Sequence, residues 1–114
     1  MASEKRIQQV VSLLQEEVSI LVKRELPLGK DVLVTIVGAE VSPDLLYATL
    51  RVSVFPPESA REVFETVTAR IWNIQQELNR RLRMRPVPKI RFVRDGASQT
   101  AARVEKLIER LDRP

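Results

Sequence analysis

Residues 46–55 read LYATLRVSVF, and from residue 47 to residue 54 polar and apolar side chains alternate at every position. Successive side chains of a β-strand point to opposite faces, so this alternation predicts a strand with one face against a core and the other toward solvent. The expected core-facing residues are Ala48, Leu50, Val52 and Val54, and the expected outward-facing residues are Tyr47, Thr49, Arg51 and Ser53.

The residues before this strand indicate a hairpin and a helix. Residues 31–41 are rich in β-formers, and the turn signal Ser42-Pro43-Asp44 joins them to the next strand by a short link, which predicts a hairpin. Residues 4–24 place apolar side chains at three- and four-residue steps. That spacing predicts an amphipathic helix with Ser3 as its N-cap.

The residues after the strand predict a long helix, a third strand and a final helix. Ser59 followed by Glu62 matches the capping-box pattern, and apolar residues continue at helical spacing to about Arg83. A bend or break within this helix is compatible with its length, although neither Pro nor Gly marks a place for it. Residues 89–94 predict the third strand, and residues 98–111 the final helix.

This order of elements predicts an α+β fold, in which a three-stranded sheet carries helices on one face. The chain has 114 residues. That length suits a single domain over residues 1–114 with one core and no need of disulfides. The uncovered face of the sheet is expected to be polar and partly basic.

The net charge of +4 is concentrated in one segment. Residues 80–94 hold seven of the 19 basic residues and no acidic residue, so the rest of the chain has 12 basic residues against all 15 acidic ones. A local basic segment on a soluble domain is typical of a surface that binds a polyanion. Nucleic acid is the favoured partner, and an acidic protein or an anionic membrane surface is the alternative.

Eight residues are candidates for contact with RNA. The arginines near the end of the long helix are suited to phosphate contacts, although helix-dipole complementarity accounts for one or two of them. The basic residues of the third strand are expected near the open sheet face, or alternatively guard an edge strand. The tryptophan either stacks on a base or packs under the C-terminal helix. The candidates are Arg80, Arg81, Arg83, Arg85, Lys89, Arg91, Arg94 and Trp72.

The composition argues against an enzyme. The chain has no Cys, no His and only three Gly, and it contains no phosphate-binding glycine loop. Asp44 and Asp95 are interpreted as turn and cap formers rather than as a catalytic pair. We therefore expect no cofactor, no metal and no small-molecule substrate. The absence of a signal-peptide pattern and of a long apolar run predicts a cytoplasmic, monomeric protein that does not bind membranes.

Three segments resemble ribosome-binding factor A, a family with a type II KH-like fold. Val41-Ser42-Pro43-Asp44-Leu45, followed by Ala48, is similar to the hairpin signature of the family. The segment from Arg85 to Phe92, closed by Asp95, resembles its Arg-x-x-Pro-x-hydrophobic-x-Phe pattern, and Arg6-Ile7 fits the start of its first helix. The resemblance covers essentially the whole chain.

The resemblance implies a role in ribosome assembly. Members of the family bind the free 30S subunit, support processing of the 5′ region of 16S rRNA and help growth in the cold. Their long helix usually bends at an Ala-x-Gly kink. Counting back from Pro88 puts the kink near residues 70–72, where neither residue is present, so the sequence leaves open whether the helix bends. The alternative function is a protein–protein interaction module that uses the hairpin edge near residues 31–37.

Overall fold

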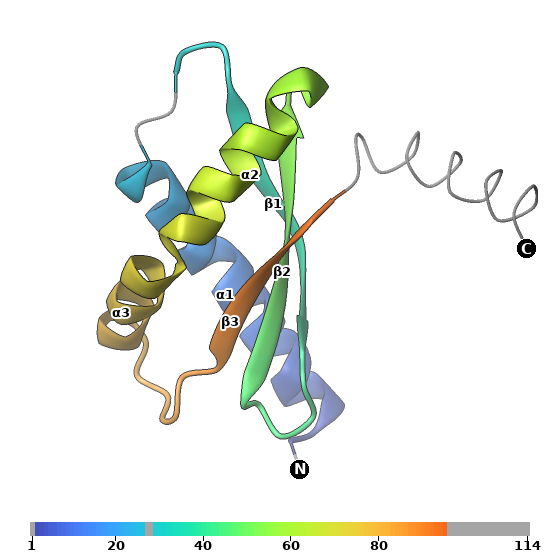
Figure 1. The fold of residues 1–114 in the computed structure, drawn as a ribbon. Helices are drawn as coiled ribbons and strands as arrows, with labels where there is room; N and C mark the ends of the chain where they lie inside the picture. The colour runs from blue at the N-terminus through green and yellow to red at the C-terminus, as the bar shows by residue number, and fades with distance from the viewer. Residues whose placement is uncertain (1, 27–28, 96–114) are drawn as a thin grey trace, which may run out of the picture.

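The computed structural model describes residues 2–26 and 29–95, and in this part of the chain three helices cover one face of a three-stranded sheet (Figure 1). The predicted α+β class and the order helix–strand–strand–helix–helix–strand are therefore confirmed. The predicted final helix at 98–111 and the turn at Asp95-Gly96 lie outside the described residues, the turn because Gly96 does.

Helix α1 (Glu4–Glu25) begins where the sequence predicts and ends one residue later than expected. The Ser3 hydroxyl accepts a hydrogen bond of 3.1 Å from the backbone N–H of Arg6, which confirms Ser3 as the N-cap. The apolar stripe of α1 packs against the sheet and α3. Its buried residues are Val10, Leu14, Val18, Leu21 and Val22.

Strands β1 (Leu33–Val41) and β2 (Tyr47–Phe55) form the predicted antiparallel hairpin. In the turn, the Ser42 hydroxyl donates to Asp44 at 2.7 Å and the Leu46 backbone N–H donates to the same carboxylate at 3.1 Å. These bonds hold the pKa of Asp44 below its ordinary value, with the Ser42 bond as the largest cause. The predicted role of Asp44 as a turn former is confirmed.

A β-bulge at Val37 changes which residues of β1 face the core. Before the bulge, Val34 and Ile36 point into the core, opposite Val54 and Val52. After it, Gly38 lies opposite Arg51 on the uncovered face. One extra residue shifts a strand by one position, and because side chains alternate, every later residue changes face.

The predicted long helix is two helices, α2 (Ala60–Ala69) and α3 (Ile71–Arg81), separated at Arg70. Arg70 has φ −98° and ψ 8°, a conformation at negative φ that needs no glycine. The break therefore forms without the Gly of the family's kink. It lies directly after Ala69, so an Ala does stand there, one residue earlier than the place expected from counting back.

The predicted capping box at Ser59 is wrong. A 3-10 turn (Pro57–Ser59) leads straight into α2, and Ser59 has φ −93° and ψ −6° with no side-chain capping bond. An N-cap residue has extended backbone geometry that turns its hydroxyl toward the N–H groups of the next turn. The preceding turn gives Ser59 helical geometry instead.

Strand β3 (Lys89–Arg94) has the predicted bounds and pairs in parallel with β2, which makes β2 the central strand. Parallel pairing requires a crossover, and α2 and α3 supply it on the covered face. Ile90 and Phe92 point into the core beside the four predicted core residues of β2, all of which are buried. The outward side chains of β2 and β3 remain on the uncovered face.

Candidate nucleic-acid interface

The eight predicted RNA-contacting residues lie in four places. We name the end of α3 and the loop after it the helix-end group: Arg80, Arg81, Arg83 and Arg85. We name the outward side chains shared by β2 and β3 the sheet-face group: Tyr47, Thr49, Arg51, Lys89 and Arg91. Trp72 and Arg94 stand apart from both groups.

The four arginines of the helix-end group are not equivalent. Arg80 is exposed and pairs at 2.6 Å with Glu77, one turn earlier on α3. Arg81 instead donates at 2.5 Å to Glu17 of α1, and the side chains of the two are only 33% and 18% exposed. This half-buried pair joins two helices, so Arg81 has a structural partner that the sequence pattern did not reveal.

The other two arginines of the group lie in the loop after α3. Arg85 donates from one terminal nitrogen to the backbone carbonyls of Leu82 and Met84, each at 2.7 Å, and so satisfies acceptors just beyond the helix end. Arg83 is exposed and makes no hydrogen bond or ion pair with another described residue. Arg83 and the remaining nitrogens of Arg80 and Arg85 are thus available to a phosphate.

Trp72 lies in the first turn of α3, next to the break at Arg70, and its side chain is 69% exposed. It lines a shallow hollow of about 160 Å³ together with Gln76 and Arg80, which follow it at four-residue steps on the same face of α3. The acidic residues Glu25 and Glu77 also line this hollow, and Glu77 is the partner of Arg80. The structure therefore brings two predicted residues, Trp72 and Arg80, to one surface. The C-terminal helix that was the alternative cover for Trp72 lies outside the described residues.

Gln75 attaches the start of β3 to α3. Its amide oxygen accepts from the backbone N–H of Ile90 at 2.8 Å, and its amide nitrogen donates to the carbonyl of Pro88 at 3.1 Å. The side chain thus pairs with the edge of β3 much as a neighbouring strand would. This pairing positions Lys89 and orients the first half of β3, and it also protects that part of the edge.

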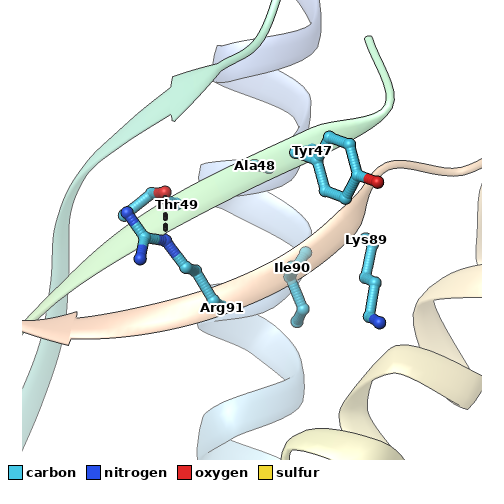
Figure 2. Close-up of a pocket in the computed structure, with 6 residues that line it drawn as sticks. All are labelled: Tyr47, Ala48, Thr49, Lys89, Ile90 and Arg91. Atoms are coloured by element: carbon cyan, nitrogen blue, oxygen red, sulfur yellow. Dashed lines mark hydrogen bonds between the residues drawn. The ribbon is translucent and has the colours of Figure 1, made fainter.

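Four members of the sheet-face group line a pocket of about 410 Å³ at the beginning of β2 and β3 (Figure 2): Tyr47, Thr49, Lys89 and Arg91. Tyr47 lies opposite Lys89, and Thr49 opposite Arg91, in the parallel register of the two strands. The Arg91 Nε donates to the Thr49 hydroxyl at 2.9 Å. The ring of Tyr47 is 61% exposed at the end of the pocket nearest to Lys89.

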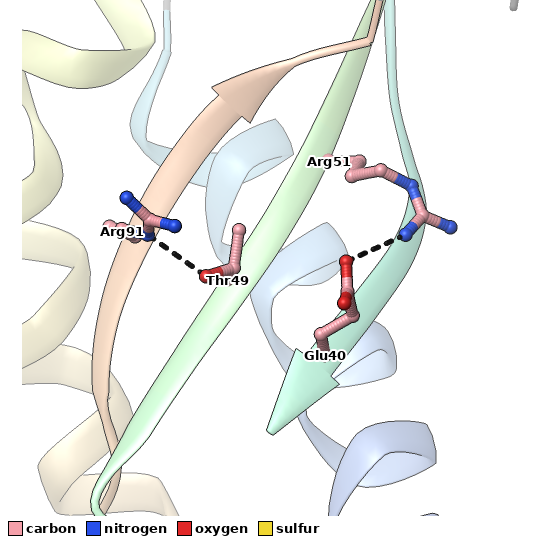
Figure 3. Close-up of polar contacts among 4 residues, drawn as sticks. All are labelled: Glu40, Thr49, Arg51 and Arg91. Atoms are coloured by element: carbon pink, nitrogen blue, oxygen red, sulfur yellow. Dashed lines mark hydrogen bonds and ion pairs between the residues drawn. The ribbon is translucent and has the colours of Figure 1, made fainter. Parts of the chain in front are cut away.

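Arg51 extends this basic surface across β1 (Figure 3). Its guanidinium lies over Gly38, where an added Cβ would be 1.9 Å from Nη2, and its Nη1 is 3.4 Å from the Glu40 carboxylate. Gly38 thus leaves the space that the guanidinium occupies. The alternation of β2 predicts Arg51 on the outward face, but Arg51 was not among the predicted site residues. Its relation to Gly38 and Glu40 depends on the bulge, for which the sequence carries no signal.

Arg94 does not belong to the pocket. It is exposed at the far end of β3, opposite Val52 in the register. Arg94 lies five positions along the strand from Lys89, so their Cα atoms are about 16 Å apart. The uninterrupted basic segment of the sequence is therefore divided in space.

Groups of three or more acidic residues that could hold a metal ion are absent from residues 2–26 and 29–95. Among the helices of the same residues, none has the length and the low polarity that crossing a membrane requires.

Comparison with known proteins gives a consistent set of matches. A family model described as ribosome-binding factor A matches residues 6–108. A curated ribosome-binding factor A from Picosynechococcus sp. is 32% identical over 98% of this chain and 88% of its own length. The crystal structure of ribosome-binding factor A from Thermus thermophilus superposes with a TM-score of 0.65 at 20% identity, covering 77% of this chain and 94% of that one.

A second structural match concerns a complex. It is a homology model of the Thermus thermophilus protein fitted into a cryo-electron microscopy map of its complex with the 30S subunit. It superposes with a TM-score of 0.59 at 19% identity and covers 73% of this chain and 88% of that one. At this identity the likeness shows a shared fold.

Proposed function

This chain belongs to the ribosome-binding factor A family, and on this premise we propose that it binds the free 30S ribosomal subunit through 16S rRNA. We further propose that it assists late maturation of the subunit, including processing of the 5′ end of 16S rRNA, and supports growth in the cold. It acts in the cytoplasm as a single-domain monomer and catalyses no reaction by itself.

Family membership over residues 6–108 is the observation that carries this proposal. The relative from Thermus thermophilus, which has been placed in a map of its 30S complex, supports the same partner. The exposed cations at the end of α3 supply the chemistry, since arginine pairs with phosphate through a planar fork. Such contacts position a protein on RNA without reading its sequence.

Trp72 and Arg80 lie along one helix, and Arg83 and Arg85 follow in the loop after it. Trp72 begins α3, Arg80 ends it, and both line the same hollow. A helix rises 1.5 Å per residue, so these two positions are about 12 Å apart along the axis. We propose that the RNA backbone follows this face of α3, with a base against Trp72 and phosphates at Arg80, Arg83 and Arg85.

A second candidate function is docking of a protein partner. Leu33 and Phe55 form a cross-strand pair on the uncovered face at the end away from the turn, and their side chains are exposed. An exposed apolar pair beside the hairpin edge suits a protein partner better than a phosphate. This function predicts concentration-dependent association that persists in high salt.

Co-sedimentation with purified 30S subunits, 50S subunits and 70S ribosomes tests the proposal. We expect binding to free 30S subunits that weakens as salt rises. The variant Arg80→Gln, Arg83→Gln, Arg85→Gln should bind more weakly, and its slope of log K against log salt should be flatter by about 1 for each phosphate that the variant no longer neutralises. Arg81 is kept, because its loss would disturb the packing of α1 on α3.

A matched variant changes three exposed arginines elsewhere: Arg6→Gln, Arg24→Gln and Arg61→Gln. It has the same net charge as the test variant, so it separates local effects from the overall charge. Equal weakening by both variants would contradict the proposed face, and absence of wild-type binding to 30S subunits would contradict the function.

A further inference from the structure

The pocket on the uncovered sheet face is separate from the α3 surface in the proposed function. It lies between the outward side chains of β2 and β3, whereas α3 packs on the opposite face of the sheet. Its volume of about 410 Å³ falls within the range of small-ligand sites. Its two ends differ in character, with an aromatic ring at Tyr47 and a guanidinium at Arg91 (Figure 2).

The charges around this pocket favour an anion. Lys89 and Arg91 line it, and Arg51 lies beside it on the same face. Glu40 is the acidic residue that shares this face, and Arg51 already pairs with it. Lys89 and Arg91 therefore keep their charge unopposed among the described residues.

Arg91 is held in a position that leaves its binding groups free. Its Nε, the inner nitrogen of the guanidinium, donates to Thr49 at 2.9 Å. The two terminal nitrogens, which form the fork that grips a phosphate end-on, make no contact with another described residue. Because Thr49 and the strand fix the side chain, less conformational freedom is lost when a ligand binds.

An aromatic ring beside two cations suits one nucleotide with an exposed base. We propose that this face binds a single unpaired RNA nucleotide, whose base stacks on Tyr47 and whose phosphate is held by the terminal nitrogens of Arg91, while Lys89 adds positive charge at the Tyr47 end. A base inside a duplex has no free face to stack, so the site selects single-stranded segments. The inference rests on the proposed function, because it supplies a second contact to the same rRNA.

The test uses the whole chain and two labelled probes, a single-stranded uridine hexamer and a blunt-ended RNA duplex in which every base is paired. Fluorescence anisotropy should show tighter binding of the hexamer. Tyr47→Ala should weaken hexamer binding about 5- to 100-fold, as expected when one base is no longer stacked. Tyr47→Phe should bind within about twofold of wild type because it keeps the ring, and Arg91→Gln should flatten the salt slope by about 1.

Phe55→Ala provides the matched control. Phe55 is an exposed aromatic on the same face of the same strand, eight residues from Tyr47. Its removal should leave hexamer binding unchanged. Circular dichroism of each variant establishes that it is folded.

Three results would overturn the inference: equal effects of the two alanine variants, equal binding of duplex and hexamer, or no hexamer binding by the folded wild-type protein. Co-sedimentation with 30S subunits separates this failure from that of the proposed function. If wild type still binds 30S subunits, only the sheet-face site is refuted. If wild type binds no subunit, the function itself fails whatever the hexamer shows.

Discussion

Replacing Gln75 by Met should loosen the start of β3 and lower the free energy of unfolding. Gln75 makes two hydrogen bonds to the strand edge, at 2.8 Å to Ile90 and 3.1 Å to Pro88. Methionine keeps the length and the apolar stem of the side chain but forms neither bond. It also loses the bond of 3.1 Å that the Gln75 amide nitrogen donates to Asn79 within α3, which adds about 0.2–0.5 kcal/mol. Both bonds to the strand edge are partly buried, so removing each should cost the net value of a hydrogen bond, about 0.5–1.5 kcal/mol, rather than the full penalty of a buried orphan.

The expected loss is therefore about 2 kcal/mol, which for a domain of 114 residues corresponds to a fall in Tm of about 8 °C. Urea unfolding followed by circular dichroism measures the change. Native-state hydrogen exchange adds a local readout, because the Ile90 amide should lose protection more than the amides of α1. The same loosening should weaken binding at Lys89 and Arg91, whose strand is held by these bonds.

Gln76→Met is the control, since Gln76 is adjacent, half-buried and without a hydrogen bond to another described residue. Its effect on the free energy of unfolding should stay within about 0.5 kcal/mol. Our account of the strand edge is refuted if the two methionine variants are equally stable, or if the Ile90 amide keeps its protection in Gln75→Met.

Other substitutions separate structural from binding roles. Arg81→Met should lower the free energy of unfolding, measured in urea, by about 1 kcal/mol and leave the salt slope of 30S binding unchanged. Arg83→Gln should leave the free energy of unfolding unchanged and flatten the salt slope of 30S binding. Gly38→Ala should keep the free energy of unfolding within about 1 kcal/mol of wild type, because a less flexible unfolded chain offsets the loss of the exposed Arg51–Glu40 ion pair. The added methyl group should nevertheless displace the Arg51 guanidinium, which a shift of the Arg51 Nε–H resonance would show. The Ser42 hydroxyl is the main group that lowers the pKa of Asp44, so Asp44→Asn should have a lower free energy of unfolding than wild type at neutral pH. This difference in free energy should vanish as the pH falls through the lowered pKa of Asp44, and its persistence at that pH would contradict the prediction.

The elements that the sequence predicted well are those whose pattern is local. Strict alternation in residues 47–54 placed β2, and apolar residues at helical spacing with Ser3 in front placed α1. Each pattern indicates that one face of the helix or strand is apolar, and burying that face against the core stabilises the element. The predicted capping box was wrong because Pro57–Ser59 forms a 3-10 turn. The residues before Ser59 set this conformation, and the Ser59–Glu62 pattern carries no information about them.

The sequence predicted which residue types make up the candidate site but not how these residues are arranged in space. The basic segment from Arg80 to Arg94 is visible in the sequence, but its residues separate onto a helix end, a sheet face and a strand end. Arg81 proved to be paired with Glu17, 64 positions earlier in the chain. No local sequence pattern predicts the contact between Arg81 and Glu17, because this contact depends on how α1 and α3 pack against each other.

By itself, the sequence determined the buried faces of α1 and β2, the order of helices and strands, the sign of the charge and the family, because these depend on side-chain type and local spacing. Tertiary structure alone decided the rest. Parallel pairing of β3 with β2 brought Arg91 to Thr49 and Lys89 to Tyr47, and the bulge at Val37 turned Gly38 toward Arg51. Strand register and helix packing set these neighbours, since both are settled only when distant parts of the chain meet around one core.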